Sequence, residues 1–426
     1  MPTITEIIKS HRPDTNAYEN IYKYFHSHPE LSFQEKETAA AIVKHLDKLK
    51  AFKITTNIGG HGLAAVLNNG PGSTILLRAD IDGLPVEEKS GLAFASKVRM
   101  VDFEGISRPS MHACGHDVHI TSLLAAAETL VRAKDQWTGT LILCFQPAEE
   151  RGAGAQAMID DGLYDKIPIP DVVVGGHVTP LRAGLIGTKH GLIASSADSY
   201  KVHIEGRQSH ASTPHTSIDP IVQAASTILR LQTIVSREVD PSDFAVVTVS
   251  AINAGDKENI IPQEADLKVN IRAGVPETRQ RVIDSMKRIV EAEALASGTS
   301  FKPELTHFTT YPLLYNDSTI TSKLERTFAA HFGSNYNPNI PRFAASEDFG
   351  ILATSINKPS CFFLYGGLDP EVYDKAEKEG KLKELPGNHS PYFVPHIGSI
   401  WTGFEAYVIS ALTFLGKEEG LSKSRL

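Results

Sequence analysis

Hydrophobic and polar positions in the first 190 residues follow two alternating patterns. Four short runs are continuously apolar, which is typical of strands buried on both faces of a sheet; they cover residues 62–67, 74–80, 140–146 and 171–178. Residues 119–133 have helical spacing, and Ser32 and Glu35 form the S-x-x-E pattern of a capping box before another helical stretch. This alternation of helices and strands predicts an α/β layer fold.

The pattern changes at about residue 193. Strands from there to about residue 310 alternate apolar and polar positions, and with two helical segments they give the order β-α-β-β-α-β of a ferredoxin-like fold. The α/β pattern then resumes with an apolar run at 360–367 and a closing helix at 399–415. The sequence therefore predicts an α/β domain of residues 1–192 and 307–426, interrupted by an inserted ferredoxin-like α+β domain of residues 193–306.

Composition excludes several classes of partner. The 426 residues include 42 basic and 50 acidic side chains, a net charge of −8 that argues against nucleic acid. No apolar run is long enough to span a membrane, and the N-terminal residues have no apolar signal core. The three cysteines are far apart, which predicts a reducing, cytoplasmic compartment without a disulfide framework. The terminal Ser424-Arg425-Leu426 resembles the S-K-L peroxisomal address, although a frayed polar tail is an equal interpretation.

Polar side chains recur at the ends of the apolar runs. Asp80 and Asp82 come at the end of the second run, Glu149 and Glu150 follow the third, and His177 lies at the end of the fourth. In open α/β sheets, ligands bind beyond the carboxyl ends of the strands. We therefore expect these carboxylates and this imidazole to form a functional site.

The stretch MHACGHD places Cys114 two residues before His116. Two interpretations compete: a Cys/His nucleophile pair, or a pair of metal ligands. Thiolate, imidazole and carboxylate are ligands of zinc-like metals. A thiol nucleophile would leave Glu149, Glu150 and His177 without a role, which favours the metal.

Nine motifs in this order resemble the M20 metallopeptidase superfamily: RADIDGLPVEE, MHACGHD, FQPAEERGAGA, GGHV, SHAS, ENIIP, VNIR, SEDFG and NHSPYF. The resemblance is strongest to its amidohydrolase branch, which includes hippurate and auxin-conjugate hydrolases, and runs from about residue 20 to 415. It implies two divalent metal ions per chain, of zinc, manganese or cobalt type. It also implies that the inserted domain is a lid or dimerisation domain. The implied metal ligands are Cys114, His116, Glu150, His177 and His389.

The same resemblance implies roles for further residues. Glu149 matches the general base, and Asp82 matches the acid that orients a metal ligand. His210 resembles a lid histidine that reaches an active site, often that of the partner subunit of a homodimer. Asn259 and Arg272 resemble lid residues that handle the carbonyl or carboxylate of the substrate. The implied reaction is hydrolysis of the amide bond of small N-acyl or N-aryl amino acids.

Three other functions stay open at this point: an M20-type dipeptidase or carboxypeptidase, an amidase with Cys114 as nucleophile, and a non-catalytic binding protein.

Two departures from the family pattern bear on the choice of substrate. The segment 96–117 is longer than in many relatives, and Arg151 stands where the family often has glycine.

Overall fold

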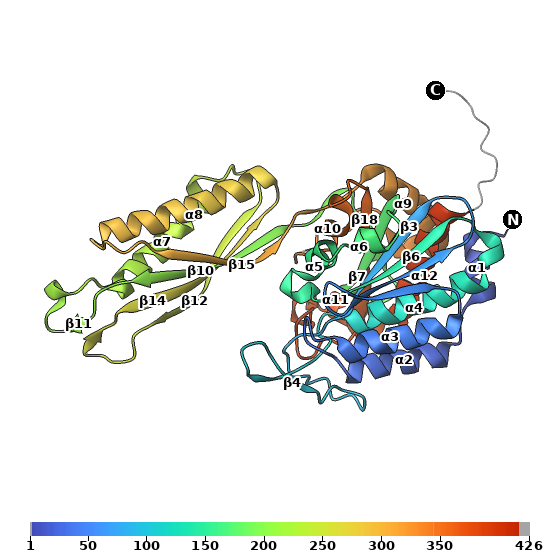
Figure 1. Ribbon diagram of the computed structural model, residues 1–426, viewed down its shortest axis with the longest axis horizontal. Coiled ribbons are helices and arrows are strands. Elements are labelled where there is room, and N and C mark those ends of the chain that lie inside the picture. Colours follow the sequence, from blue (N-terminus) through green and yellow to red (C-terminus); the bar gives the residue numbers. More distant parts are fainter. Residues whose placement is uncertain (1, 344, 417–426) are drawn as a thin grey trace, which may run out of the picture. The chain divides into compact units, whose positions relative to one another are not determined.

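The computed structural model describes residues 2–343 and 345–416 and divides into two compact units (Figure 1). The first unit comprises Met1–Ile193, Tyr315–Arg342 and Asp348–Leu426, and the second comprises Ala194–Leu314 and Phe343–Glu347. The second unit continues past the expected limit at residue 306, because β15 (Glu304–Tyr311) pairs along β10 (Ser196–Glu205). The tripeptide Ser424–Leu426, which resembles a peroxisomal address, lies outside the described residues.

The first unit is built on an eight-stranded mixed sheet with the order β1-β2-β6-β3-β7-β18-β8-β17. Strands β6, β3, β7 and β18 run parallel to their neighbours in this group, whereas β1 and β2 are antiparallel at one edge. The strands are β1 (Lys53–Ile58), β2 (Gly62–Asn68), β3 (Thr74–Asp80), β6 (Thr140–Gln146), β7 (Val172–Arg182), β8 (Ile186–Gly187), β17 (Tyr336–Asn337) and β18 (Ser360–Leu368).

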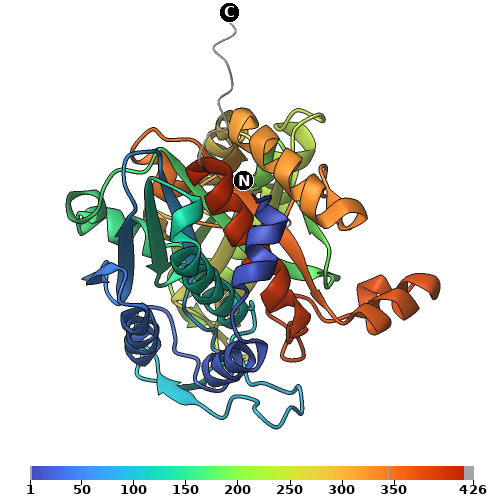
Figure 2. The same cartoon turned by 90° about the vertical axis from the view of Figure 1, so that its right-hand side faces the viewer.

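Helices cover both faces of this sheet. On one face, α4 and α12 pack against each other and on β3, where Ile75, Leu77 and Ala79 belong to the same core cluster as their apolar residues. On the other face, Arg78 hydrogen-bonds to Asp348, just before α10. Figure 2 shows α2 and α3 beside α4. The helices of this unit are α1 (Ile4–His11), α2 (Thr15–Ser27), α3 (Lys36–Leu49), α4 (His116–Arg132), α5 (Gly154–Asp160), α6 (Leu163–Lys166), α9 (Ser318–Phe332), α10 (Gly350–Thr354), α11 (Pro370–Lys378) and α12 (Gly398–Leu415).

The N-terminus of α3 differs from the sequence prediction. Glu35 is the residue before the helix, but its side chain makes no hydrogen bond to the helix, and Ser32 does not cap it either. The Glu30 carboxylate instead accepts the N–H groups of Glu37 and Thr38, at 3.2 and 2.7 Å. The predicted capping box is therefore wrong, because another carboxylate already satisfies the free N–H groups of the first turn.

The second unit has a four-stranded antiparallel sheet with the order β12-β14-β10-β15. Helices α7 (Pro220–Arg237) and α8 (Pro276–Ala296) contribute to its core cluster. The chain order β10, α7, β12 (Ala245–Ala254), β14 (Glu264–Ala273), α8, β15 is ferredoxin-like, which confirms the predicted fold class. Across both units, no helix within the described residues is long and apolar enough to cross a bilayer.

Candidate metal centre

The start of α4 brings Cys114 and His116 against strand β7. Gly115 precedes the helix with φ of 83°, and a Cβ atom there would lie 2.3 Å from Val178 Cγ1. Glycine is therefore required both by the backbone conformation and by the close approach. As a result, Cys114 Sγ lies 3.4 Å from His177 Nε2.

His116 is oriented through one ring nitrogen and presents the other to carboxylates. Its Nδ1 donates to the carbonyl oxygen of Asp82 at 2.9 Å. Its Nε2 lies 3.6 Å from Asp80, 3.9 Å from Glu149 and 3.8 Å from Glu150. Burial alone would lower the pKa of His116, but the charges of Asp80 and Asp82 outweigh it and raise the pKa to about 10. So much negative charge around one imidazole favours binding of a cation.

The adjacent glutamates lie on a short 3-10 turn, Glu149–Arg151, that follows β6. Ala148, just before the turn, is left-handed with φ of 49° and ψ of 40°. The Glu150 N–H donates to Asp82 Oδ2 at 3.1 Å, and Glu150 Oε2 lies 3.4 Å from His389 Nε2. Burial raises the pKa of Glu150 to about 8. The turn thus aims two successive carboxylates at the same cluster, which an extended strand cannot do.

Two of the candidate ligand groups share Glu150, whereas His177 belongs to another, with Asp80, His116 and His119. One group is Cys114, Glu150 and His389, and another is His116, Glu149 and Glu150; within each, the ligand atoms lie within 4.8 Å of one another. His116 Nε2 and Glu150 Oε1 are buried without a hydrogen-bond partner among the residues that the structure describes. Buried polar atoms normally have a partner. The donor types and these two free atoms fit divalent metal ions.

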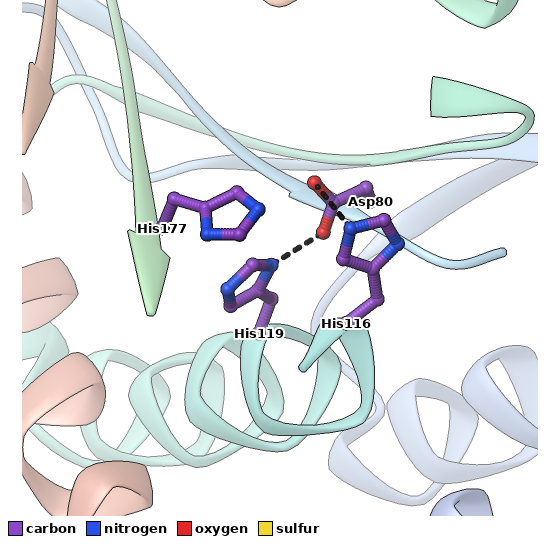
Figure 3. A group of neighbouring side chains, drawn as sticks. All are labelled: Asp80, His116, His119 and His177. Carbon is purple, nitrogen blue, oxygen red and sulfur yellow. Dashed lines mark hydrogen bonds and ion pairs between the residues drawn. The ribbon is translucent and has the colours of Figure 1, made fainter. Parts of the chain in front are cut away.

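His119 and Asp80 support this centre from one side (Figure 3). His119 Nδ1 lies 2.5 Å from Asp80 Oδ1, and its Nε2 accepts the N–H of Val178 at 2.9 Å. Both ring nitrogens are therefore engaged, and the ring packs edge-on against His177 at 4.6 Å between centroids. We did not predict His119 from the sequence, although it lies three residues after His116 and so on the same face of α4.

His26, another buried histidine, contacts Asp117, the residue of α4 that follows His116. His26 Nδ1 is 2.6 Å from Asp117 Oδ2, and its Nε2 is 3.1 Å from Glu88 Oε1. Burial by itself would lower the pKa of His26, but hydrogen bonds to Asp117 and Glu88 raise it to about 9. Both carboxyl pKa values are lowered in turn. This triad ties α2, α4 and the segment after β3 together.

The three predicted lid residues lie in the second unit, at two separate places. His210 in β11 (Ser209–His210) pairs with β13 (Ile260–Ile261), and the Ala211 N–H donates to the Asn259 carbonyl at 3.0 Å, so His210 and Asn259 are close together. Arg272 lies eight residues along β14 from its first residue, Glu264. Eight residues of strand span roughly 27 Å. Because β13 ends three residues before Glu264, Arg272 is therefore at the far end of β14 from the two-stranded sheet of β11 and β13 that holds His210.

The long segment 96–117 and Arg151, the two departures from the family pattern, contact each other. The long segment contains a hairpin of β4 (Arg99–Val101) and β5 (Ser107–Pro109), with Phe103 exposed at its tip. The guanidinium carbon of Arg151 lies 5.4 Å from the centre of the Phe103 ring, a cation–π contact. Since Arg151 directly follows Glu150, this contact places the hairpin tip beside the Glu149–Arg151 turn.

Comparisons with known proteins place the chain in a family of hydrolases. The model of peptidase family M20/M25/M40 matches residues 76–380. The chain is 39% identical over 348 residues to an N-acetyl-L-cysteine deacetylase of Bacillus subtilis, covering 81% of this chain and 79% of that protein. It is 38% identical over 359 residues to a hippurate hydrolase of Campylobacter jejuni, covering 84% and 89%. A solved dinuclear metal-binding peptidase of the M20 family from Bacillus subtilis superposes with a TM-score of 0.73 at 29% identity, covering 94% of this chain and 98% of that one.

Proposed function

The chain belongs to the M20/M25/M40 peptidase family and is a hydrolase, and we propose that it cleaves the amide bond of N-acyl amino acids. The observation that carries this proposal is the cluster of thiol, imidazole and carboxylate groups, buried except at the exposed His389, with Glu149 at its edge. The names of the deacetylase and the hippurate hydrolase support amide-linked acyl groups as the substrate class.

The metal ligands in this proposal are those that the resemblance implied. A family structure described as dinuclear and the donor types found here support divalent metal ions. Bound together, two such ions would lower the pKa of a shared water and polarise the amide carbonyl. The proposed ligands for two ions are Cys114, His116, Glu150, His177 and His389.

Glu149 is the proposed general base. Its side chain is buried but adjoins the ligand cluster, with Oε2 at 3.9 Å from His116 Nε2. Its carboxylate would accept a proton from the attacking water and deliver it to the nitrogen of the leaving amine. Asp82 would act beside it as a positioning residue, since its oxygens hold both the His116 ring and the Glu150 N–H.

A thiol nucleophile is less well supported. Burial, and then the negative charges of Glu150 and Glu149, raise the pKa of the Cys114 thiol well above its usual range. Reactive cysteines have the opposite shift, because the thiolate is the nucleophile. A bound divalent cation would reverse this effect, since a coordinating thiol loses its proton.

We further propose a homodimer in which His210 reaches the site of the partner subunit. His210 and Arg272 lie at opposite ends of the second unit, too far apart to contact one small substrate from a single chain. Apolar side chains are exposed along one side of this unit: Val222 and Leu229 of α7, 61% and 73% exposed, and Ile252 of the edge strand β12. An exposed apolar surface beside an unpaired strand edge is typical of an association surface.

A substrate panel on metal-reconstituted protein tests the proposal. The panel contains benzoyl-glycine, N-acetyl amino acids and unblocked dipeptides, assayed with zinc, manganese and cobalt in turn. We expect hydrolysis of the N-acyl compounds, with about two metal equivalents retained after dialysis. Hydrolysis of dipeptides alone would indicate the peptidase alternative. Full activity of metal-free protein would restore Cys114 as the nucleophile, and inactivity on every compound would favour a binding protein.

A further inference from the structure

Glu35 is a buried carboxyl group with a role other than the helix cap that its sequence position indicates. The residue is fully buried. Its Oε1 accepts two backbone N–H groups, from Phe33 and from Ala148, each at 2.8 Å. Burying an ionisable group is unfavourable unless it is hydrogen-bonded. Since Glu30 already caps α3, these two bonds are what Glu35 contributes.

The contact with Ala148 is made at the point where the chain turns toward the metal centre. Ala148 has left-handed backbone angles, which are unfavourable for a residue with a side chain. Its carbonyl accepts the N–H of Gly154 at 3.2 Å, while its N–H is held by Glu35. This conformation must be maintained by its surroundings, and Glu35 provides the only side-chain hydrogen bond to Ala148 among the described residues.

Glu149 is thus flanked by two backbone groups that are bound to buried carboxylates. The N–H before it, of Ala148, donates to Glu35, and the N–H after it, of Glu150, donates to Asp82 Oδ2. Both anchors reach the turn from other parts of the chain, one from before α3 and one from after β3. The bond to Glu35 holds the Pro147–Ala148 peptide plane, and the bond to Asp82 holds the Glu149–Glu150 plane.

We propose that Glu35 is a positioning residue that holds the Ala148 peptide so that Glu149 and Glu150 point into the metal centre. This inference rests on the roles proposed above for these two glutamates. A displacement of about 1 Å in a catalytic group can lower turnover by roughly 100-fold. Loss of the anchor therefore reduces turnover through Glu149 and metal affinity through Glu150.

Two substitutions of similar size separate this role from a general contribution to stability. Glu35→Met fills the same space without an acceptor, whereas Glu35→Gln keeps a carbonyl oxygen that can accept both N–H groups. Burial, and then the charge of Asp82, raise the pKa of Glu35 to about 8, so the neutral amide is a close substitute. Glu30→Met is the matched control, because it removes a carboxylate that binds backbone N–H groups of the same segment without contacting the turn.

The experiment measures kcat, KM, melting temperature, and the zinc affinity of each apoprotein by competition with a chelator. We expect Glu35→Met to lower kcat by about 10–100-fold, with little change in KM, and to weaken zinc binding. Glu35→Gln should restore both values, and Glu30→Met should lower only the melting temperature. If Glu35→Met lowers the melting temperature but leaves kcat and zinc affinity as in Glu30→Met, the proposal is wrong.

A double variant distinguishes this proposal from the assignment of the base. If Glu35 acts through Glu149, adding Glu35→Met to Glu149→Gln should lower kcat little further, because the group being positioned is already lost. A full multiplicative loss of kcat would overturn positioning of the base. Full activity of Glu149→Gln alone would refute the base assignment, while weaker zinc binding in Glu35→Met than in Glu30→Met would still support positioning of Glu150.

Discussion

Replacing Glu149 and Glu150 separately by Gln should produce two different defects, although the residues are adjacent and chemically identical. Glu149→Gln keeps the shape and hydrogen-bonding capacity of the side chain but removes its ability to accept a proton. General acid–base catalysis contributes about 10²–10⁴-fold to rate, so we expect turnover to fall by this factor. This corresponds to a barrier higher by roughly 3–5 kcal/mol, with metal content and KM nearly unchanged.

Glu150→Gln should instead weaken metal retention. Its two oxygens face different groups, with Oε1 at 3.8 Å from His116 Nε2 and Oε2 at 3.4 Å from His389 Nε2. Gln has one neutral oxygen and one NH₂ group, so one of the two sides loses its acceptor as well as the negative charge. Even the loss of an indirect partner of a metal ligand costs about 10–100-fold in affinity, so we expect at least this effect.

The assay is metal content after dialysis together with kcat on an N-acyl amino acid, with and without added metal. Added metal should partly restore Glu150→Gln, because mass action refills a weakened site. It should not restore Glu149→Gln, in which the missing function is proton transfer. If Glu149→Gln loses metal while Glu150→Gln keeps metal and loses turnover, the two roles are reversed. If neither change matters, the catalytic site lies elsewhere.

Three further predictions follow from other parts of the structure. The pKa of His26 is raised from 6.5 to about 9, so its pairing with Asp117 should contribute ~3 kcal/mol to the free energy of unfolding below pH 6.5. This contribution should be lost as the pH rises through 9. The free energies of unfolding of wild type and His26→Gln, measured from denaturant curves, should therefore converge at high pH. Arg151→Gly and Phe103→Ala should change the ratio of kcat/KM between acyl groups by about tenfold without changing metal content. Unchanged ratios would show that the hairpin does not contribute to substrate specificity. Leu229→Glu should convert a dimer to monomers in light scattering and lower turnover; active monomers would contradict a role for the partner subunit.

The strands at the centre of the first unit could be predicted closely from the sequence. The mainly apolar runs at 74–80 and 140–146 coincide with β3 and β6, because strands covered on both faces are apolar at most positions. Polar residues at their carboxyl ends then indicated where a site would form. The partners of these strands in the sheet could not be predicted, since pairing depends on contacts between distant segments.

The ends of the second unit were less predictable. Alternating strands and two helices indicated the ferredoxin-like order, which the sheet of β12, β14, β10 and β15 confirms. The position of Arg272 relative to His210 could not be predicted, because the motifs give order along the chain and not which end of a strand each residue occupies. The distance between them supports the proposal, already implied by the resemblance, that His210 acts at the site of a partner subunit.

The wrong prediction of a helix cap at Glu35 shows that a local sequence pattern does not determine which N–H group a carboxylate binds. A carboxylate can accept any nearby backbone N–H, so the pattern S-x-x-E is compatible with a helix cap and with an anchor for a distant loop. The sequence cannot distinguish these, because the competing acceptor Glu30 and the N–H of Ala148 are brought close only by the tertiary fold. Since α3 is capped without Glu35, the burial of an acid at this position needs another explanation. Holding the left-handed Ala148 beside the two glutamates proposed as base and metal ligand is an explanation that these hydrogen bonds support.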